Sequence, residues 1–389
     1  MKTIYFDNSA TTCVSAAAAE AAMQVMREDF GNPSSLHGMG LKAARRLREA
    51  RETLAGLLQV KAEELYFTSC GSESNNMLIM GVAEARRSGR IIVSAIEHAA
   101  VQEPARYLLQ RGFEVCYAPV DARGVVDVDK LCELLTPDTV LVSIMQVNNE
   151  VGSIQPLTEI GAAVKRLAPQ AIFHIDGVQG FGKRPVELAR WQADAYSISA
   201  HKIHGPKGVG LLWLKQGVRI PPLIRGGGQE HGQRSGTENL PGIVAFATAA
   251  AESCRNMAAN TAAMLQVKQA LYEQLITIED AVLNGPDVAE GAAHILNMSF
   301  PGVRSEVLLH CLEAQGICVS SGSACSSHKS SGSGVLAAMG AGEERADSAL
   351  RFSFCAENTV EEAAVVAAAV KAAVSDLRMM QKGKGKRRR

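Results

Sequence analysis

The 389-residue sequence has few aromatic residues, 5% of the total, and no excess of either charge, since 40 Lys and Arg balance 40 Asp and Glu. This balance excludes a nucleic-acid binder that works through bulk charge, and 47% hydrophobic content excludes intrinsic disorder. Six of the basic residues lie within 382–389, which leaves 34 basic against 40 acidic residues in the remainder. We therefore expect a mildly acidic globular protein with a basic, disordered tail at 381–389.

Long apolar runs are also missing. The longest, Ala363 to Val370, is too short to cross a bilayer, and the opening sequence MKTIYFDNSATT lacks the apolar stretch of a signal peptide. The nine cysteines are odd in number and include no Cys-x-x-Cys pair, which argues against a disulfide framework or a zinc ribbon. No metal site is predicted. These absences together predict a cytoplasmic protein.

From about residue 64, short β-branched runs alternate with helical patterns. The runs are LYFT (65–68), IIVSAI (91–96), FEVCYAPV (113–120), TVLVSIM (139–145), AIFHID (171–176), AYSISA (195–200) and GVGLLWL (208–214). Strands interleaved with helices at this spacing are typical of a parallel sheet covered on both faces. The sequence therefore predicts an α/β fold whose large domain holds a seven-stranded, mostly parallel sheet.

The flanking regions have a different pattern. A helix capped by Ser15 and ending before Gly31 is predicted first, then a second through 42–58, and a long connecting helix over 240–276. Strand patterns at 294–300, 317–320 and 350–355, with helices near 304–315 and 358–378, predict a smaller α+β domain. We expect residues 1–14 to join the small domain, 15–259 to form the large domain and 260–380 the small one.

Lys202 is the first candidate for chemistry, because SISAHK places it directly after a predicted strand. The carboxyl edge of a parallel sheet is where α/β proteins bind ligands. The preceding Ser199 and His201 can donate hydrogen bonds to a phosphate, and an amine can form a Schiff base with an aldehyde. A lone lysine at such a place would otherwise be solvated surface.

Three further features fit this chemistry. Asp176 ends another predicted strand and could keep a pyridinium nitrogen protonated, although it could equally cap a helix. The loop SCGSESNN (69–76) precedes a helix whose first N–H groups, with the Ser72 hydroxyl, could hold a phosphate. A third loop, RGGGQEHGQRSGTEN (225–239), is rich in glycine and hydrogen-bonding side chains, which suits close approach to an anion.

Taken together, from YFDNSATT (5–12) to RFSF (351–354), these motifs resemble a cysteine desulfurase, a pyridoxal-phosphate enzyme with the aspartate-aminotransferase-like, class V fold. The resemblance covers nearly the whole chain. It implies that Lys202 binds the cofactor covalently, that Asp176 pairs with the pyridine nitrogen and that Gln179 bonds the phenolic oxygen. It also implies that His98 stacks on the ring and moves protons.

The remaining roles also follow from the resemblance. Asn149 lies near substrate and cofactor, and Arg351 binds the substrate carboxylate, for which a planar guanidinium is suited. The residues implied in phosphate binding are Gly71, Ser72, Ser199, His201 and Thr237, the last reaching in from a second subunit. That arrangement requires a homodimer. Taken singly, His98 could simply cap a helix, Asn149 could be a turn residue, and Arg351 could form a structural ion pair.

Cys325 is the distinctive residue, in the segment SSGSACSSHKSSGSG (320–334), which has eight serines and three glycines. That composition is typical of a mobile loop, and a linker is the simplest alternative. In the resemblance, Cys325 attacks the sulfur of L-cysteine, which yields alanine and an enzyme persulfide. The other eight cysteines are interpreted as small buried hydrophobes. The Ser-Ser-Gly-Ser-Ala-Cys pattern favours the long-loop, housekeeping branch of the family.

The implied function is a sulfurtransferase that passes sulfur to an acceptor protein for iron–sulfur cluster assembly or tRNA thiolation. Three alternatives remain open: selenocysteine lyase activity, an aminotransferase indifferent to loss of Cys325, and a cofactor-free scaffold that binds sulfur-transfer proteins. The sequence departs from the family pattern twice, with Cys70 in place of a usual glycine and Gly177 in place of a usual alanine. The acceptor and any role of the basic tail, for which contact with RNA or an acidic partner is one alternative, are left open by the sequence.

Overall fold

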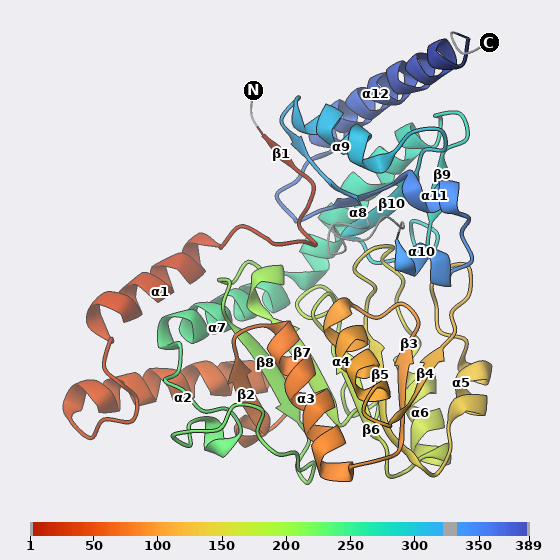
Figure 1. Cartoon of the computed structure of the whole chain (residues 1–389). Helices are drawn as coiled ribbons and strands as arrows, with labels where there is room; N and C mark the ends of the chain where they lie inside the picture. The colour runs from red at the N-terminus through yellow and green to blue at the C-terminus, as the bar shows by residue number, and fades with distance from the viewer. Residues whose placement is uncertain (1–2, 322–332, 387–389) are drawn as a thin grey trace.

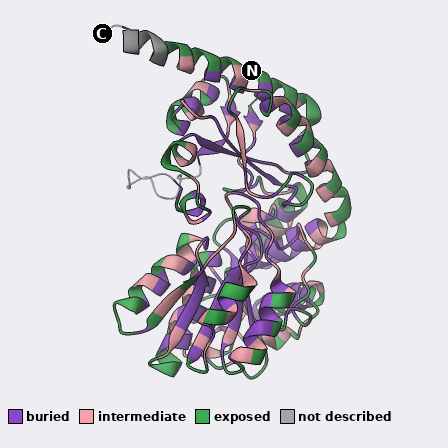
Figure 2. Ribbon diagram, turned by 90° about the vertical axis from the view of Figure 1, so that its right-hand side faces the viewer, coloured by how far each residue is buried: buried purple, intermediate pink, exposed green. Residues whose placement is uncertain are grey.

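The computed structural model describes residues 3–321 and 333–386, with side chains described as far as residue 380. Its elements form two lobes (Figure 1), and in both most of the strand residues are buried (Figure 2). In the described part of the chain no helix is both long and apolar enough to cross a membrane.

The large sheet has seven strands in the order β2-β8-β7-β6-β5-β3-β4. Their bounds are β2 (Leu65–Thr68), β3 (Arg90–Ser94), β4 (Glu114–Ala118), β5 (Thr139–Met145), β6 (Ile172–Asp176), β7 (Ala195–Ser199) and β8 (Gly210–Leu214). All neighbours pair in parallel except β8, which runs antiparallel to both β7 and β2. The predicted α/β fold with a seven-stranded, mostly parallel sheet is therefore confirmed.

Helices cover both faces of this sheet, since its central strands are apolar on both sides. One apolar core packs α3 and α4 on one face, and another packs α2, α5, α6 and α7 on the other. The bounds are α1 (Ala16–Glu28), α2 (Gly38–Leu58), α3 (Gly71–Arg86), α4 (Ala99–Leu109), α5 (Val128–Leu134), α6 (Leu157–Leu167) and α7 (Leu240–Arg255), with 3-10 turns η1 (Ala62–Glu64), η2 (Ala200–Lys202) and η3 (Glu230–Gly232).

The smaller lobe has a four-stranded antiparallel sheet, β12-β13-β10-β9, and a two-stranded pair in which β1 runs parallel to β11. The strands are β1 (Ile4–Tyr5), β9 (Val282–Asn284), β10 (Ile295–Ser299), β11 (Ile317–Cys318), β12 (Ser320–Ser321) and β13 (Ala349–Ser353). The helices are α8 (Met257–Leu275), α9 (Ser305–Glu313), α10 (Gly334–Ala338), α11 (Glu343–Asp347) and α12 (Val360–Lys386). Through β1 the start of the chain therefore lies against its C-terminal part.

Several local predictions can be compared directly with these bounds. Ser15 caps α1 as predicted, since its Oγ accepts from Ala18 N at 3.3 Å. The single helix predicted over 240–276 is wrong, because Asn256 interrupts it with ψ near 5° and separates α7 from α8. The predicted strand at 317–320 is split between two sheets as β11 and β12.

The domain bounds stay predictions. The boundary expected at 259/260 falls inside α8, whose Met264, Val267 and Leu271 belong to the core of the smaller lobe. The helix α12 runs into the residues of the expected basic tail, and the disorder of that tail stays a prediction.

Candidate active site

Lys202 lies at the carboxyl edge of the large sheet, in the turn η2 that follows β7. The register pairs Met145 with Asp176 and Asp176 with Ser197, so the ends of β5, β6 and β7 meet at this edge. The Lys202 ammonium donates to the backbone carbonyls of Ser9 at 2.6 Å and Ala10 at 2.8 Å. The N-terminal segment thus packs on the candidate lysine, a contact that the sequence did not predict.

Asp176 is buried, with 5% of its surface exposed, at the end of β6. Its Oδ2 accepts from Asn75 Nδ2 at 2.7 Å, and its Oδ1 accepts from Val178 N at 3.0 Å. Both donors are neutral, so they orient the carboxylate without cancelling its charge. Asn75, one turn into α3, was not among the predicted site residues, although it belongs to the loop SCGSESNN and contacts the candidate carboxylate.

The start of α3 approaches β7 closely. A Cβ on Gly71 would lie 2.6 Å from Val178 Cγ2 and 3.6 Å from Ser199 Cβ, so only glycine fits at this point. The Ser199 hydroxyl is buried without a hydrogen-bond partner, while Ser72 is exposed. A buried, unsatisfied hydroxyl beside a helix N-terminus is a fitting position for an anion.

His98 caps α4, and its Nδ1 accepts from Ala100 N at 3.1 Å. The capping alternative is therefore correct for Nδ1, and the neutral ring carries its hydrogen on Nε2. Burial lowers the pKa of His98, with the Lys202 and Arg351 charges adding to the shift and Asp176 opposing it. A neutral imidazole with its hydrogen on Nε2 can donate a hydrogen bond from that nitrogen.

Arg351 extends from β13 and is 7% exposed. It donates to Asp7 Oδ1 at 2.8 Å and to the Asn149 carbonyl at 2.9 Å, while its Nε is buried without a partner. The structural ion pair considered as an alternative is thus present, with Asp7 as its carboxylate. The structure brings together the loop of Asn149, the N-terminal segment and β13.

Gln179 and His201 complete the cluster beside Lys202. Gln179 donates from Nε2 to the Ser9 carbonyl at 2.9 Å, and its Oε1 accepts from Lys183 at 3.4 Å. His201 Nδ1 lies 3.2 Å from the Thr11 hydroxyl. Burial, with Lys202 and other nearby lysines, lowers the pKa of His201 to about 4, so the ring is neutral at pH 7.

Thr237 is exposed on the loop 225–239. Arginine pairs hold the loop, among them Arg234 with Glu73 in the first turn of α3 at 2.8 Å and Arg51 with Glu230 at 2.6 Å. The second pair is buried, with Glu230 in a left-handed conformation at φ 48°. No described contact joins Thr237 to Ser199 or Gly71 within this chain, which leaves its predicted role in a second subunit untested.

Cys325 lies outside the described residues, but the residues that flank it are placed. Ser320 in β12 pairs with Arg351 in β13. On the far side, Ser333 caps α10 and donates from its hydroxyl to Glu150, the residue after Asn149. Both described flanks therefore lie beside residues of the candidate site.

The two departures from the family pattern have local explanations. Cys70 is the N-cap of α3 with an extended backbone, φ −175°, that any residue can adopt. A Cβ on Gly177 would lie 1.9 Å from Cζ of the buried Tyr196, whose hydroxyl donates to Gln146 Oε1 at 2.6 Å. The tyrosine ring therefore fills the space that an alanine methyl group would need.

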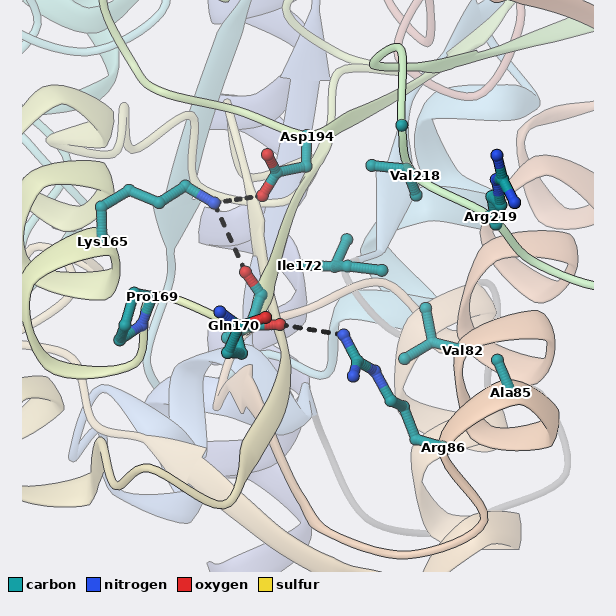
Figure 3. Close-up of a pocket in the computed structure, with 12 residues that line it drawn as sticks. Val82, Ala85, Arg86, Lys165, Pro169, Gln170, Ile172, Asp194, Val218 and Arg219 are labelled. Atoms are coloured by element: carbon teal, nitrogen blue, oxygen red, sulfur yellow. Dashed lines mark hydrogen bonds and ion pairs between the residues drawn. The ribbon is translucent and has the colours of Figure 1, made fainter.

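A separate cavity of about 420 Å³ lies at the opposite edge of the sheet, near the start of β6 and β7 (Figure 3). It is lined by Ile172 and Asp194, and Asp194 is paired with Lys165. None of the predicted site residues lines it. The candidate site is therefore the carboxyl edge.

The chain matches the family model described as "Aminotransferase class-V" over residues 4–366. It belongs to the class V aminotransferase family. The chain is 41% identical to "Cysteine desulfurase IscS" of Methanosarcina thermophila over 381 residues, which cover 97% of this chain and 94% of that one.

Two solved structures are also similar to this class V chain. One, "NIFS-LIKE PROTEIN", has a TM-score of 0.91 at 41% identity and covers 96% of this chain and 100% of its own. The other, "SspA in complex with cysteine", has a TM-score of 0.80 at 32% identity and covers 90% of this chain and 99% of its own. The predicted family is thus confirmed.

Proposed function

We propose that this protein is a cysteine desulfurase that converts L-cysteine to L-alanine and stores the sulfur as a persulfide on Cys325. One observation carries the proposal: Lys202, Asp176 and Arg351 meet at one edge of the sheet, where both described flanks of the Cys325 segment also lie. The names of the similar class V proteins support the same activity.

The residues present fit pyridoxal phosphate. The unpartnered Ser199 hydroxyl and the glycine at the start of α3 suit its phosphate, and the buried Asp176 carboxylate suits a pyridinium nitrogen. Lys202 would hold its aldehyde carbon, with Gln179, His98 and Asn149 around the ring and His201 and Ser72 near the phosphate. When bound, the cofactor supplies an electron-withdrawing ring that acidifies the α-carbon of an amino acid.

The side chains of this chain divide the remaining work. Arg351 binds the substrate carboxylate, its free Nε and the N–H groups beside it offering donors in a fixed plane. Lys202 moves the α-proton, and His98 delivers a proton after it has itself been protonated. The Cys325 thiolate attacks the substrate sulfur, so that an S–S bond forms as the C–S bond breaks. The electron pair of that C–S bond and one proton pass to the substrate carbon, which leaves as alanine.

The dimer also belongs to the proposal. Exposed apolar side chains gather within residues 23–41, and patches of this kind mark protein interfaces. They are Met23, Met26, Phe30, Leu36, Met39 and Leu41. We propose that a second copy covers them and that Thr237 of the partner subunit completes the phosphate site.

The acceptor of the persulfide sulfur is proposed to be a protein of iron–sulfur cluster assembly or of tRNA thiolation. A free nucleophilic thiol stays reduced only where the surroundings keep cysteines from forming disulfides. We therefore propose a cytoplasmic location.

The test compares the purified holoenzyme with Cys325→Ala after both are shown by absorbance to carry the cofactor. Alanine and sulfide are measured from L-cysteine with a reductant. Equal amounts of both from the parent and neither from the variant are expected. Keto-acid production that survives in Cys325→Ala would establish an aminotransferase, and a protein that never retains the cofactor would establish a scaffold. A parallel assay with L-selenocysteine determines which substrate is preferred.

A further inference from the structure

The loop that carries Asn149 is built around a buried asparagine. Asn148 Oδ1 accepts from the backbone N–H groups of Glu150 and Val151, both at 2.9 Å, and its Nδ2 donates to the Ile96 carbonyl at 3.0 Å. These bonds fix the backbone of the loop at Glu150, whose own side chain bonds to another part of the chain.

That other part is the start of α10. The Ser333 hydroxyl donates to Glu150 Oε2 at 2.5 Å and accepts from Leu336 N at 3.2 Å, so one side chain both caps the helix and binds the glutamate. In addition, Asn297 of β10 donates to the Glu150 carbonyl at 3.1 Å. Glu150 therefore connects the large sheet to two elements of the smaller lobe.

Apolar contacts reinforce the same junction. Val335, Leu336 and Met339 form a small core with Ile96, Met145 and Val151 of the large lobe. Burial raises the pKa of Glu150 to about 7, while the Ser333 hydrogen bond and the Arg351 charge oppose that shift. Arg351 itself donates to the neighbouring Asn149 carbonyl.

We propose that Glu150 is a positioning residue, which through Ser333 anchors the chain eight residues after Cys325 beside Asn149 and Arg351. The proposal rests on the proposed function. Glu150 takes no part in proton transfer at the substrate α-carbon. Its loss should therefore slow attack on sulfur and leave α-proton chemistry intact.

Two readouts on the holoenzyme separate these steps. Exchange of the α-proton of L-alanine in D2O, followed by NMR, needs Lys202 but no Cys325, whereas alanine release from L-cysteine needs both. Cys325→Ala is the reference variant for the two assays, because it should retain α-proton exchange and lose desulfuration. Ser15→Ala is the matched cap control, because Ser15 caps α1 without contacting Glu150.

Glu150→Ala and Ser333→Ala should each lower kcat for desulfuration about tenfold, the equivalent of one lost hydrogen bond, with exchange within twofold of the parent. Glu150→Gln should restore the rate, since its carboxamide oxygen still accepts from Ser333. Parent-like desulfuration in Glu150→Ala, or exchange falling in proportion, overturns the proposal. So does a Glu150→Gln variant as slow as Glu150→Ala. A parent that exchanges the alanine proton yet releases no alanine from L-cysteine overturns the proposed function, and this proposal with it.

Discussion

At the scale of single residues, Arg351 is held in place in a way that suits the substrate-binding role proposed for it. Its guanidinium already donates to Asp7 and to the Asn149 carbonyl, which fixes its plane and leaves Nε available. A lysine cannot make these bonds and also bind a carboxylate in two places. We therefore expect Arg351→Lys to raise KM for L-cysteine about tenfold or more with a smaller change in kcat, measured as alanine release. The exposed Arg190→Lys is the control, and an unchanged KM in Arg351→Lys would contradict the assignment.

Glu97, next to His98 in the sequence, should make the free energy of unfolding depend on pH. Its Oε1 accepts from Ser94 and from Met145 N, its Oε2 has no partner, and burial, aided by the Asp176 charge, raises its pKa to about 8. The folded state thus keeps the proton between about pH 4.5 and 8 while the unfolded state loses it. The contribution of Glu97 to the free energy of unfolding is fully present below pH 4.5. Between pH 4.5 and 8 it falls by about 1.4 kcal/mol for each pH unit.

Glu97→Gln should remove this dependence. Chemical unfolding of the apoprotein at several pH values should show the free energy of unfolding of the variant rising relative to the parent between pH 5 and 8. Parallel curves for the two proteins would show that Glu97 is ionised in the folded state.

At the scale of elements, the loop 225–239 offers a matched pair of contacts. Arg51 and Glu230 form a buried ion pair, whereas Arg225 and Glu84, which hold the same loop, are more than half exposed. Breaking a buried pair leaves an uncompensated charge and costs about 3 kcal/mol or more, while exposed pairs contribute under about 1 kcal/mol.

We therefore expect Glu230→Gln to lower the free energy of unfolding by about 3 kcal/mol and to weaken cofactor retention, since this loop carries Thr237. Glu84→Gln should change neither measurably. Denaturant unfolding and cofactor release on dilution are the two measurements. Equal effects from both variants would mean that the loop does not depend on the buried pair.

The sequence predicted the elements well wherever hydrophobic pattern and local turn signals agree. Lys202 and Asp176 were accessible because each follows a buried strand, and Ser15 because capping is local. The break at Asn256 was missed, since apolar residues continue at helical spacing on both sides of it. Asp7, Ser9 and Glu150 were missed for another reason: their roles depend on contacts with residues far away in the chain, which periodicity does not reveal.

At the scale of the whole molecule, the exposed apolar side chains within residues 23–41 predict a dimer. Leu36 is 91% exposed, so Leu36→Asp should leave the fold of one chain intact while it adds buried charge to an interface. Sedimentation should show the parent as a dimer and the variant as a monomer at micromolar concentration, with weaker cofactor retention. Met379→Asp, at a position 60% exposed on α12, is the control. A dimeric Leu36→Asp would place the interface elsewhere.

The N-terminal segment that follows β1 bears on the order of folding, because its partners lie far away in the chain. Asp7 pairs with Arg351 across 344 residues of sequence, and Ser9 holds Lys202 across 193. Contacts this distant form late, because a long stretch of chain must close before they are gained. During synthesis the large sheet can assemble while the ribosome still holds the residues of β13, but Asp7 then has no arginine to pair with. The proposed site is complete only when β13 has left the ribosome. An unfinished chain therefore contains Lys202 but lacks the Arg351 side chain beside it.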